Sequence, residues 1–296
     1  MSSTSMMPAS SGSSVSPLSS SERADVGSIP AAASASRTAD IGAKSKPQAR
    51  RSVVGWARTL ARGFADIVFP PVCLNCGGLV EGERLRHICP PCEALIHFVE
   101  SPHCTTCGSP FFGEVEGERM CPHCEGLHPH YGEGRTLTLF KGPSRALIHA
   151  LKYHKGHHVV PDLEQLVRSS PHITDFIRDA VLVPVPLHSR KERERSYNQT
   201  ALLAALMARA AGGRTRVEPL LCRVVDTPSQ TTFDRKARRA NLKNAFALAK
   251  GATINPASPY ILVDDVFTTG STLNSCAGVL RRAGALNLNV VTFGHG

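Results

Sequence analysis

Two adjacent acids and a run of small hydroxyl residues stand together in YILVDDVFTTGSTL, residues 260–273. The apolar half predicts a strand buried on both faces that ends at Asp264 and Asp265. A helix beginning after the turn would offer free backbone N–H groups and its positive dipole end to an anion. The segment therefore predicts a phosphate cradle beside carboxylates that could bind sugar hydroxyls or hold Mg²⁺ through water. The cradle residues are Thr268, Thr269, Gly270, Ser271 and Thr272.

The same segment has a simpler interpretation, a surface loop that caps a helix. One acid and one hydroxyl residue would be enough for that role, whereas the complete segment carries two acids and four hydroxyl residues. A Walker A loop is excluded, because the chain contains no Gly-Lys-Ser/Thr sequence. A sugar-phosphate site is therefore the favoured prediction.

Eight of the ten cysteines form four C-x-x-C pairs, separated by gaps of 12, 11 and 13 residues. Each pair can turn two thiolates toward one ion, and two pairs complete a tetrahedral structural zinc site. Pairing in chain order is simplest, but a cross-braced pairing stays open, and His103 or His123 could replace a cysteine ligand. The expected ligands of about two zinc ions are Cys73, Cys76, Cys89 and Cys92, then Cys104, Cys107, Cys121 and Cys124.

A disulfide scaffold is the alternative for these pairs. The C-x-x-C rhythm and the lack of an apolar secretory signal favour metal binding in the cytoplasm instead. Gly77 and Gly108 follow two of the pairs closely, where a tight turn with a positive φ favours glycine. Cys222 and Cys276 stand alone, and Cys276 lies in an apolar helical stretch typical of a core.

The chain has 296 residues and a 42% hydrophobic content, enough for one sizeable core and a smaller module. No apolar run reaches about 18 residues, so no membrane span is expected. Residues 1–50 are rich in Ser, Ala and Pro, which predicts a disordered tail; a transit peptide or a misplaced start codon are alternatives. Apolar residues spaced three or four apart predict an amphipathic helix over 51–70.

The formal net charge of +10 is unevenly distributed. Residues 51–130 carry 6 basic and 9 acidic side chains, whereas residues 131–296 carry 23 basic and 12 acidic ones. The basic excess of the C-terminal part suggests a polyanionic ligand, either a phosphorylated metabolite or nucleic acid. Solubility alone is the competing explanation.

After residue 131, apolar segments alternate with helical patterns, which predicts a parallel sheet with helices on its faces. Strands are expected at 135–140, 180–187, 260–265 and 286–293, and helices at 143–154, 161–169, 196–211 and 271–284. Ligands of such sheets bind beyond the carboxyl ends of the strands. Two loops would reach that edge, 183–199 and the segment with the paired acids.

Four segments together resemble one protein family. VDDVFTTGST at 263–272 resembles the phosphoribosyl-pyrophosphate (PRPP) loop of type I phosphoribosyltransferases. LKYHKG at 151–156, VPVPLHSRKERERSYNQ at 183–199 and RVVDTPSQTTFDRKARRANLKNAF at 223–246 resemble segments of its ComF-type branch, which is linked to competence and DNA uptake. Where that pattern has Gly-Phe, this chain has Ser196 and Tyr197, and Phe233 replaces a leucine. The resemblance covers residues 55–296.

The resemblance implies an α/β protein with the type I phosphoribosyltransferase fold, a mainly parallel sheet flanked by helices. A small Cys-rich zinc-ribbon module would precede that sheet. The implied domains are a tail at 1–50, an amphipathic helix at 51–70, a double zinc ribbon at 71–130 and a phosphoribosyltransferase domain at 131–296.

The resemblance also implies Mg²⁺-dependent transfer of phosphoribose from PRPP to an unidentified nitrogen acceptor, with release of pyrophosphate. The cradle residues would hold the 5-phosphate, Asp264 and Asp265 would meet the ribose hydroxyls, and Arg190 and Arg195 would bind pyrophosphate. The segment 223–239 resembles a mobile loop that closes over the site. Contacts to the acceptor are expected from residues 131–160, with Lys152 and Tyr153 as candidates.

A non-catalytic protein is the main alternative. It would sense PRPP or bind single-stranded DNA during transformation, with proteins of the competence machinery as partners. The basic C-terminal part suits nucleic acid, but a 5% aromatic content leaves few platforms for base stacking. A glutamine-dependent amidotransferase is disfavoured, since no suitably placed nucleophilic cysteine is evident. The oligomeric state stays open.

Overall fold

The computed structural model describes residues 70–81, 84–113, 119–153, 156–187, 192, 197–224 and 245–296. All of them belong to one compact unit, Val54–Gly296. The predicted tail at 1–50 and the helix at 51–70, except its last residue, lie outside these ranges, as do Arg190, Arg195 and most of the segment 223–239. Among the described helices, none has the length and apolar content needed to cross a membrane.

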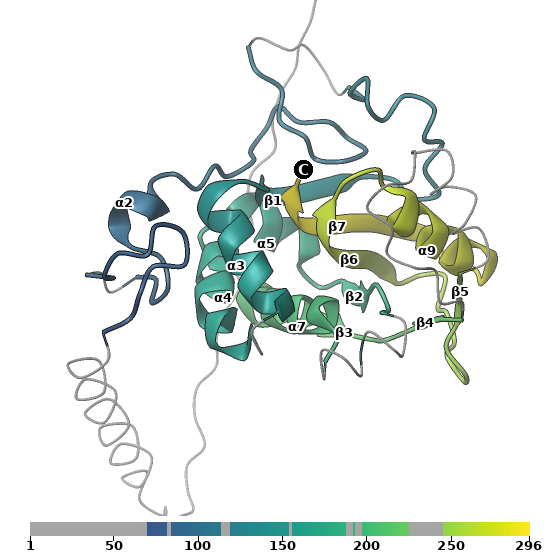
Figure 1. Ribbon diagram of the computed structural model, residues 1–296. Coiled ribbons are helices and arrows are strands. Elements are labelled where there is room, and N and C mark those ends of the chain that lie inside the picture. Colours follow the sequence, from purple (N-terminus) through teal and green to yellow (C-terminus); the bar gives the residue numbers. More distant parts are fainter. Residues whose placement is uncertain are drawn as a thin grey trace, which may run out of the picture. The chain divides into compact units, whose positions relative to one another are not determined.

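A five-stranded parallel sheet, labelled in Figure 1, positions the paired acids. Its strands in spatial order are β1 (Gly134–Leu139), β7 (Asn287–His295), β6 (Pro259–Phe267), β2 (Val181–Pro184) and β3 (Arg216–Val217). The chain leaves β2 toward β3 on one side and leaves β6 toward β7 on the other side. The carboxyl ends of β2 and β6 therefore flank the point where a parallel sheet forms its ligand crevice.

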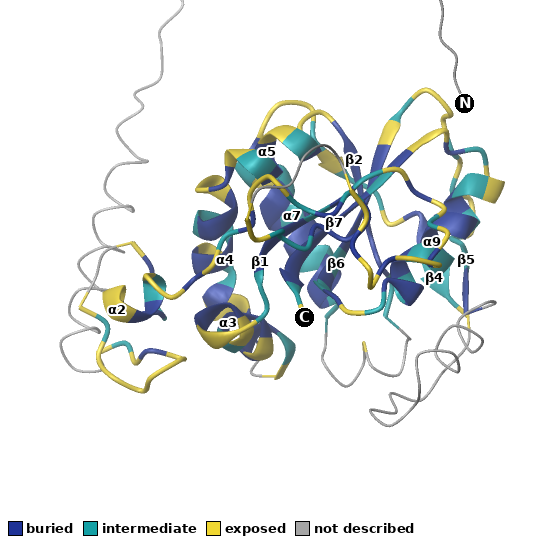
Figure 2. Ribbon diagram, turned by 90° about the horizontal axis from the view of Figure 1, so that it is seen from above, coloured by how far each residue is buried: buried dark blue, intermediate teal, exposed yellow. Residues whose placement is uncertain are grey.

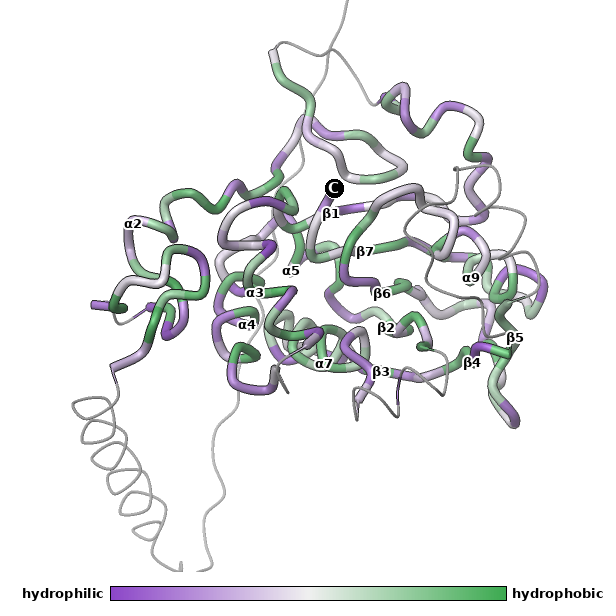
Figure 3. The backbone as a smooth tube through the Cα atoms, in the orientation of Figure 1, coloured by the Kyte–Doolittle hydropathy of each residue, from purple (hydrophilic) through white to green (hydrophobic). Residues whose placement is uncertain are grey.

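Helices cover both faces of this sheet, as Figure 2 shows. One face packs against α3 (Gly142–Tyr153), α4 (Val160–Arg168), α5 (Pro171–Ile177) and α7 (Gln199–Ala211), and α9 (Ser271–Arg282) covers the other. Ile261 and Val263 of β6 belong to the first core, whereas Tyr260 and Leu262 belong to the second. The alternating direction of side chains along a strand explains this division. In Figure 3 the hydrophobic colour lies on the middle of β7, whereas α3 and α4 alternate in polarity.

Several short elements were not anticipated from the sequence. They are α2 (Pro90–Glu93), the 3₁₀ turn η1 (Gly156–Val159), α5, β3 and the antiparallel pair β4 (Leu221–Arg223) and β5 (Phe246–Leu248). Strands of two or three residues leave no periodic signal in a sequence. The expected helices and the four longer strands all form, with ends that shift by a few residues.

The strand that carries the acids is longer than the sequence indicated. We expected it to end at Asp264 and Asp265, but β6 continues to Phe267. Its parallel pairing with β7 persists to the pair Phe267 and His295, which holds the backbone extended past the acids. Asp264 and Asp265 therefore lie inside a strand, and their side chains point to opposite faces of the sheet.

The cysteine-rich segments dock on the sheet domain at two places. Backbone N–H groups of Arg86 and His87 donate to the two carboxylate oxygens of Asp162 in α4, at 3.0 and 2.8 Å. Farther along, the backbone N–H of Gly134 in β1 donates to Thr105 O at 2.7 Å. The predicted fold class, a mainly parallel sheet flanked by helices and preceded by a Cys-rich module, is confirmed. The domain boundaries stay a prediction.

Candidate functional site

The eight paired cysteines form two clusters in chain order. The first comprises Cys73, Cys76, Cys89 and Cys92, the second Cys104, Cys107, Cys121 and Cys124, and the ligand atoms of each cluster lie within 4.8 Å of one another. Four thiolates at such spacing fit a tetrahedral zinc ion, so the two clusters are consistent with two zinc ions. The cross-braced pairing is absent from the described residues, and neither cluster includes His103 or His123.

The turns that shape the clusters use glycine as expected. Gly77 and Gly108 have φ values of 76° and 70°, in the left-handed region. A Cβ on Gly108 would come within 2.5 Å of the backbone nitrogen of Thr136 in β1, so the second cluster can sit directly on the sheet. All four cysteines of the second cluster are buried, whereas Cys76 of the first is exposed. The second cluster is therefore the more closely integrated with the sheet domain.

The predicted phosphate cradle connects β6 to α9. Gly270 has a φ of 67° and stands at the N-cap of α9. Glycine has no side chain that could cap the helix, and Thr269 Oγ1 accepts a long hydrogen bond of 3.4 Å from Ser271 N. A Cβ on Gly270 would lie 2.6 Å from the Phe267 ring, so glycine is required for space as well as for conformation. Thr269 Oγ1 lies 2.9 Å from Ser271 Oγ. A helix start with a glycine N-cap and hydroxyl groups beside it fits a phosphate group.

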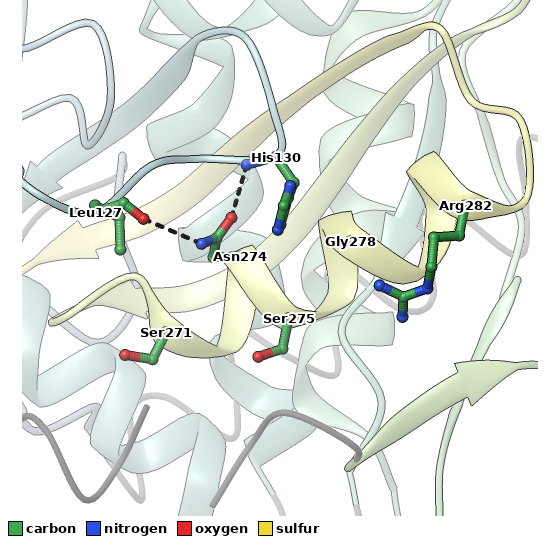
Figure 4. Close-up of a pocket in the computed structure, with 7 residues that line it drawn as sticks. All are labelled: Leu127, His130, Ser271, Asn274, Ser275, Gly278 and Arg282. Atoms are coloured by element: carbon green, nitrogen blue, oxygen red, sulfur yellow. Dashed lines mark hydrogen bonds between the residues drawn. The ribbon is translucent and has the colours of Figure 1, made fainter. Parts of the chain in front are cut away.

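A short strap, residues 127–130, fixes the first half of α9 (Figure 4). Asn274 accepts a hydrogen bond from His130 N at 2.7 Å and donates to the carbonyl oxygens of Leu127 and His128 at 3.3 Å. A pocket of about 270 Å³ lies beside this contact, on the flank of α9. The strap follows Cys124 in the chain and thus links the second cluster to the helix whose start forms the cradle.

Asp265 is held on the face of the sheet that carries α3 and α7. Lys152 Nζ of α3 lies 2.9 Å from Asp265 Oδ2, and Gln199 Nε2 of α7 donates to the same oxygen at 3.1 Å. Asp265 Oδ1 has no hydrogen-bond donor within the part of the chain that the structure describes. One carboxylate oxygen is thus already engaged by a cation, while the other remains open to a ligand.

Asp264 lies on the opposite face, toward α9. Burial, and after it the charge of Asp265, raises the pKa of Asp264 to about 7, although the residue keeps partial solvent exposure. Burial and then the charge of Asp264 raise the pKa of the buried Cys276 thiol, as expected for a carboxylate beside α9. Carboxylate oxygens are the ligands that Mg²⁺ prefers, so the donor set at the end of β6 fits this ion.

The second cysteine cluster forms a wall of a pocket at the cradle. This pocket, of about 250 Å³, is lined by Cys107, Ser109 and His123 from the ribbon and by Thr268 and Thr269 from the cradle, among others. His295 at the end of β7 also lines the pocket and stacks on Phe267, with ring centroids 5.6 Å apart. The ribbon thus lines this pocket, and the expected contacts between residues 131–160 and an acceptor stay a prediction.

The sequence interpretation missed two roles on the α3 and α7 side. Nothing in the sequence indicated a contact between Gln199 and the paired acids, yet Gln199 Nε2 donates to Asp265. The Tyr197 hydroxyl donates to Leu151 O and accepts from Gly156 N at 3.0 Å, which ties the end of α3 to the start of α7. Tyrosine in place of the phenylalanine of the family pattern was the available signal. Lys152, a candidate for contacts to the acceptor, lies 2.9 Å from Asp265, and its role toward an acceptor stays a prediction.

Comparisons with known proteins agree with the cysteine pattern and cover most of the chain. Residues 64–125 match the double zinc ribbon domain family. Competence protein F of Haemophilus influenzae is 29% identical over 222 residues, 74% of this chain and 94% of the relative. DNA utilization protein YhgH of Salmonella typhi is 31% identical over 193 residues, 58% of this chain and 82% of the relative. Competence protein ComFC of Bacillus subtilis is 22% identical over 215 residues, 67% of this chain and 79% of the relative.

Among solved structures, a hypoxanthine phosphoribosyltransferase from Staphylococcus aureus aligns with a TM-score of 0.30 and 13% sequence identity. The alignment covers 45% of this chain and 62% of that chain, less than two thirds of its length.

Proposed function

The chain belongs to the ComF/YhgH family, which includes Competence protein F and DNA utilization protein YhgH, and from this premise we propose that it binds PRPP and transfers its phosphoribosyl group. The reaction would release pyrophosphate and attach the ribose to a nitrogen acceptor whose identity stays open. Mg²⁺ would accompany PRPP. The site lies at the carboxyl ends of β6 and β2, where the sheet opens its crevice.

The observation that carries this proposal is the start of α9, where the N-cap residue is a glycine without a side chain to bind the first N–H groups of the helix. Gly270 has a left-handed backbone conformation and no side chain, so a bound phosphate could approach the backbone closely. Thr269 and Ser271 place hydroxyl groups beside the first N–H groups of the helix. These donors suit the 5-phosphate of PRPP, with Thr268 and Thr272 completing the cradle. A dianion there would supply the negative charge that the positive dipole end of a helix attracts.

The carboxylates of Asp264 and Asp265 would bind the ribose hydroxyls from the two faces of the sheet. Asp264 and Asp265 stand four and three residues before Thr268, the first residue of the cradle, with one acid on each face of the sheet. Their carboxylates would accept hydrogen bonds from ribose hydroxyls and hold Mg²⁺, which supplies positive charge against the leaving pyrophosphate when bound. Positive charge that builds on the ribose as the bond breaks would be stabilised by the same carboxylates.

Leaving group and acceptor would occupy opposite sides of β6. The loop after β2 carries Arg190 and Arg195 in the sequence, and these cations suit pyrophosphate. A nucleophile that attacks opposite the leaving group would approach from the β7 side. There the pocket between the second ribbon and the cradle offers about 250 Å³ of space. We therefore place the acceptor beside the second zinc ribbon.

Calorimetric titration with PRPP and Mg²⁺ tests the proposal directly. The wild-type protein should bind one PRPP per chain, and Thr269→Val should weaken binding about tenfold, because a hydroxyl donor to a charged phosphate is lost. Ser275→Ala is the matched control, since Ser275 lines the flank pocket of α9 and not the cradle. Screening nitrogen acceptors for pyrophosphate release then tests catalysis. Absence of saturable PRPP binding would remove the proposal.

The pKa of Asp264 gives this binding a pH dependence. Asp264 is neutral below and ionised above about 7, because burial and Asp265 raise its pKa. Since the anion is the form that binds Mg²⁺, the affinity for Mg–PRPP should rise about tenfold from about pH 6 to about pH 8. As a control, the binding of ribose 5-phosphate without metal shows how the titration of the phosphate group alone changes affinity with pH. Identical pH profiles for the two ligands would exclude a role for Asp264.

Single-stranded DNA binding is the second candidate, in place of or beside catalysis. The observation that favours it is the basic excess of residues 131–296, with 23 basic and 12 acidic side chains, together with the names of the relatives. Binding to the phosphate backbone should weaken steeply as salt rises. A DNA affinity that falls at least about tenfold between about 50 and 200 mM salt supports this role, and an affinity independent of salt excludes it.

A further inference from the structure

Lysine 152 already supplies a cation to the carboxylate that the proposed reaction needs. Its Nζ lies 2.9 Å from Asp265 Oδ2, and the two side chains are only 21% and 11% exposed. We propose that Lys152 is a resident counter-cation that competes with the divalent metal for Asp265 and so sets the metal requirement of PRPP binding. This inference rests on the proposed function, because it assumes that Asp265 meets a metal-bound sugar phosphate.

The backbone at Lys152 is held in place by the contacts around the end of α3. The residue lies in the last turn of α3, and the Tyr197 hydroxyl bridges Leu151 O and Gly156 N just beside it. A Cβ on Gly156 would come within 2.3 Å of Leu151 Cα, so the chain after α3 folds tightly against the helix end. The long, flexible stem of a lysine would let the ammonium withdraw from Asp265 when a ligand binds.

Both cations would use the same carboxylate. Gln199 Nε2 donates to Asp265 Oδ2 at 3.1 Å and keeps the carboxylate oriented while Lys152 is bound. A divalent metal on Asp265 would be a like charge a few ångströms from the ammonium, in a site with little water to screen it. Either the ammonium withdraws or the metal binds weakly. In the absence of sugar phosphate, the ammonium therefore holds the site.

The second acid strengthens this need for a counter-cation. Asp264 directly precedes Asp265 on β6, and the backbone N–H of Asp265 donates to Asp264 Oδ1 at 2.8 Å. Two carboxylates therefore lie near the end of this strand. Lys152 is in direct contact with Asp265, and the positive charge of Arg223 also acts on Asp264. Loss of the lysine would remove the cation that touches the pair. A protein without the lysine should attract divalent metal before any substrate is present.

Titration of the full-length protein with Mn²⁺ tests the inference, and the paramagnetic signal of free Mn²⁺ reports how much metal is bound. The cysteine sites are first loaded with zinc, so that Mn²⁺ reports on the carboxylates. Lys152→Met should bind Mn²⁺ about tenfold more tightly than wild type, since the competing charge is gone. Lys152→Arg should stay within about twofold of wild type, because the cation is kept. Lys250→Met controls for the loss of an exposed lysine elsewhere.

Ribose 5-phosphate separates this inference from the proposed function. It engages the cradle without requiring a metal, so wild type and Lys152→Met should bind it equally within about twofold. If Mn²⁺ binds both proteins equally, or neither, the competition by Lys152 is overturned even though ribose 5-phosphate still binds. If ribose 5-phosphate and PRPP both fail to bind wild type, the proposed function itself falls. A well-folded Lys152→Arg variant that gains metal affinity would also contradict the inference.

Discussion

Replacing Asp265 with asparagine is expected to weaken Mg–PRPP binding at least about a hundredfold and to leave the fold intact. Asp265 would lose its charge-assisted hydrogen bond to the ribose and its contact with Mg²⁺, each worth about 1.5–3 kcal/mol. Its carboxylate also balances Lys152, so the single substitution leaves an unpaired ammonium that is partly exposed. Calorimetry with PRPP and Mg²⁺ measures the effect on binding.

The charge left on Lys152 calls for a second variant. The double change Asp265→Asn with Lys152→Met removes both members of the ion pair and should restore thermal stability without restoring PRPP binding. Thermal unfolding of the three proteins separates the two effects. Unchanged PRPP affinity in the single variant would show that Asp265 does not contact the ligand, and the assignment of β6 as the sugar-binding strand would then be wrong.

Loss of the second zinc site is expected to have the next largest effect. Elemental analysis of protein purified without chelator should find about two zinc ions per chain, and Cys107→Ser should leave about one. Zinc binding and folding of such ribbons are coupled, so the second ribbon should loosen. Its knuckle is fastened to β1, since Thr136 Oγ1 donates to Cys107 O at 2.9 Å, and it lines the pocket at Thr268 and Thr269. PRPP affinity should fall about tenfold.

The first zinc site provides the matched comparison. Cys76→Ser should also remove one zinc ion, but Cys76 is exposed and its cluster docks on α4 through Asp162, away from the cradle. PRPP affinity should then stay within about twofold of wild type. Equal losses of PRPP affinity in the two cysteine variants would contradict a specific role of the second ribbon. Protein that contains no zinc would contradict the assignment of both clusters.

Local sequence signals were enough to predict much of the fold. The cysteine spacing predicted two clusters and, with pairing in chain order, their members, because a C-x-x-C knuckle is a local structure. The continuous apolar run at Ile261, Leu262 and Val263 predicted a strand covered on both faces, and helices do cover both faces of β6. The positive φ at Gly77 and Gly108 followed from their place after a pair.

Contacts between segments far apart in the chain could not be predicted from local sequence patterns. Lys152, Gln199 and Asp265 meet only because α3 and α7 pack on the same face of β6, and no spacing in the chain encodes that meeting. The length of β6 was underestimated because its last residues are held by pairing with β7, a tertiary influence that outweighs local preference. The ribbon's place beside Thr268 depends on the fit of Gly108 against β1, which is likewise a matter of packing.

The claim on which the account depends is that the start of α9 binds the phosphate of a sugar phosphate. A crystal structure of the full chain with Mg²⁺ and PRPP tests it most directly. We predict phosphate oxygens within about 3 Å of the hydroxyl groups of Thr269 and Ser271 and of the first N–H groups of α9, with the ribose over Asp265. A ligand bound elsewhere on the protein, with the cradle filled by its own side chains, would contradict the account.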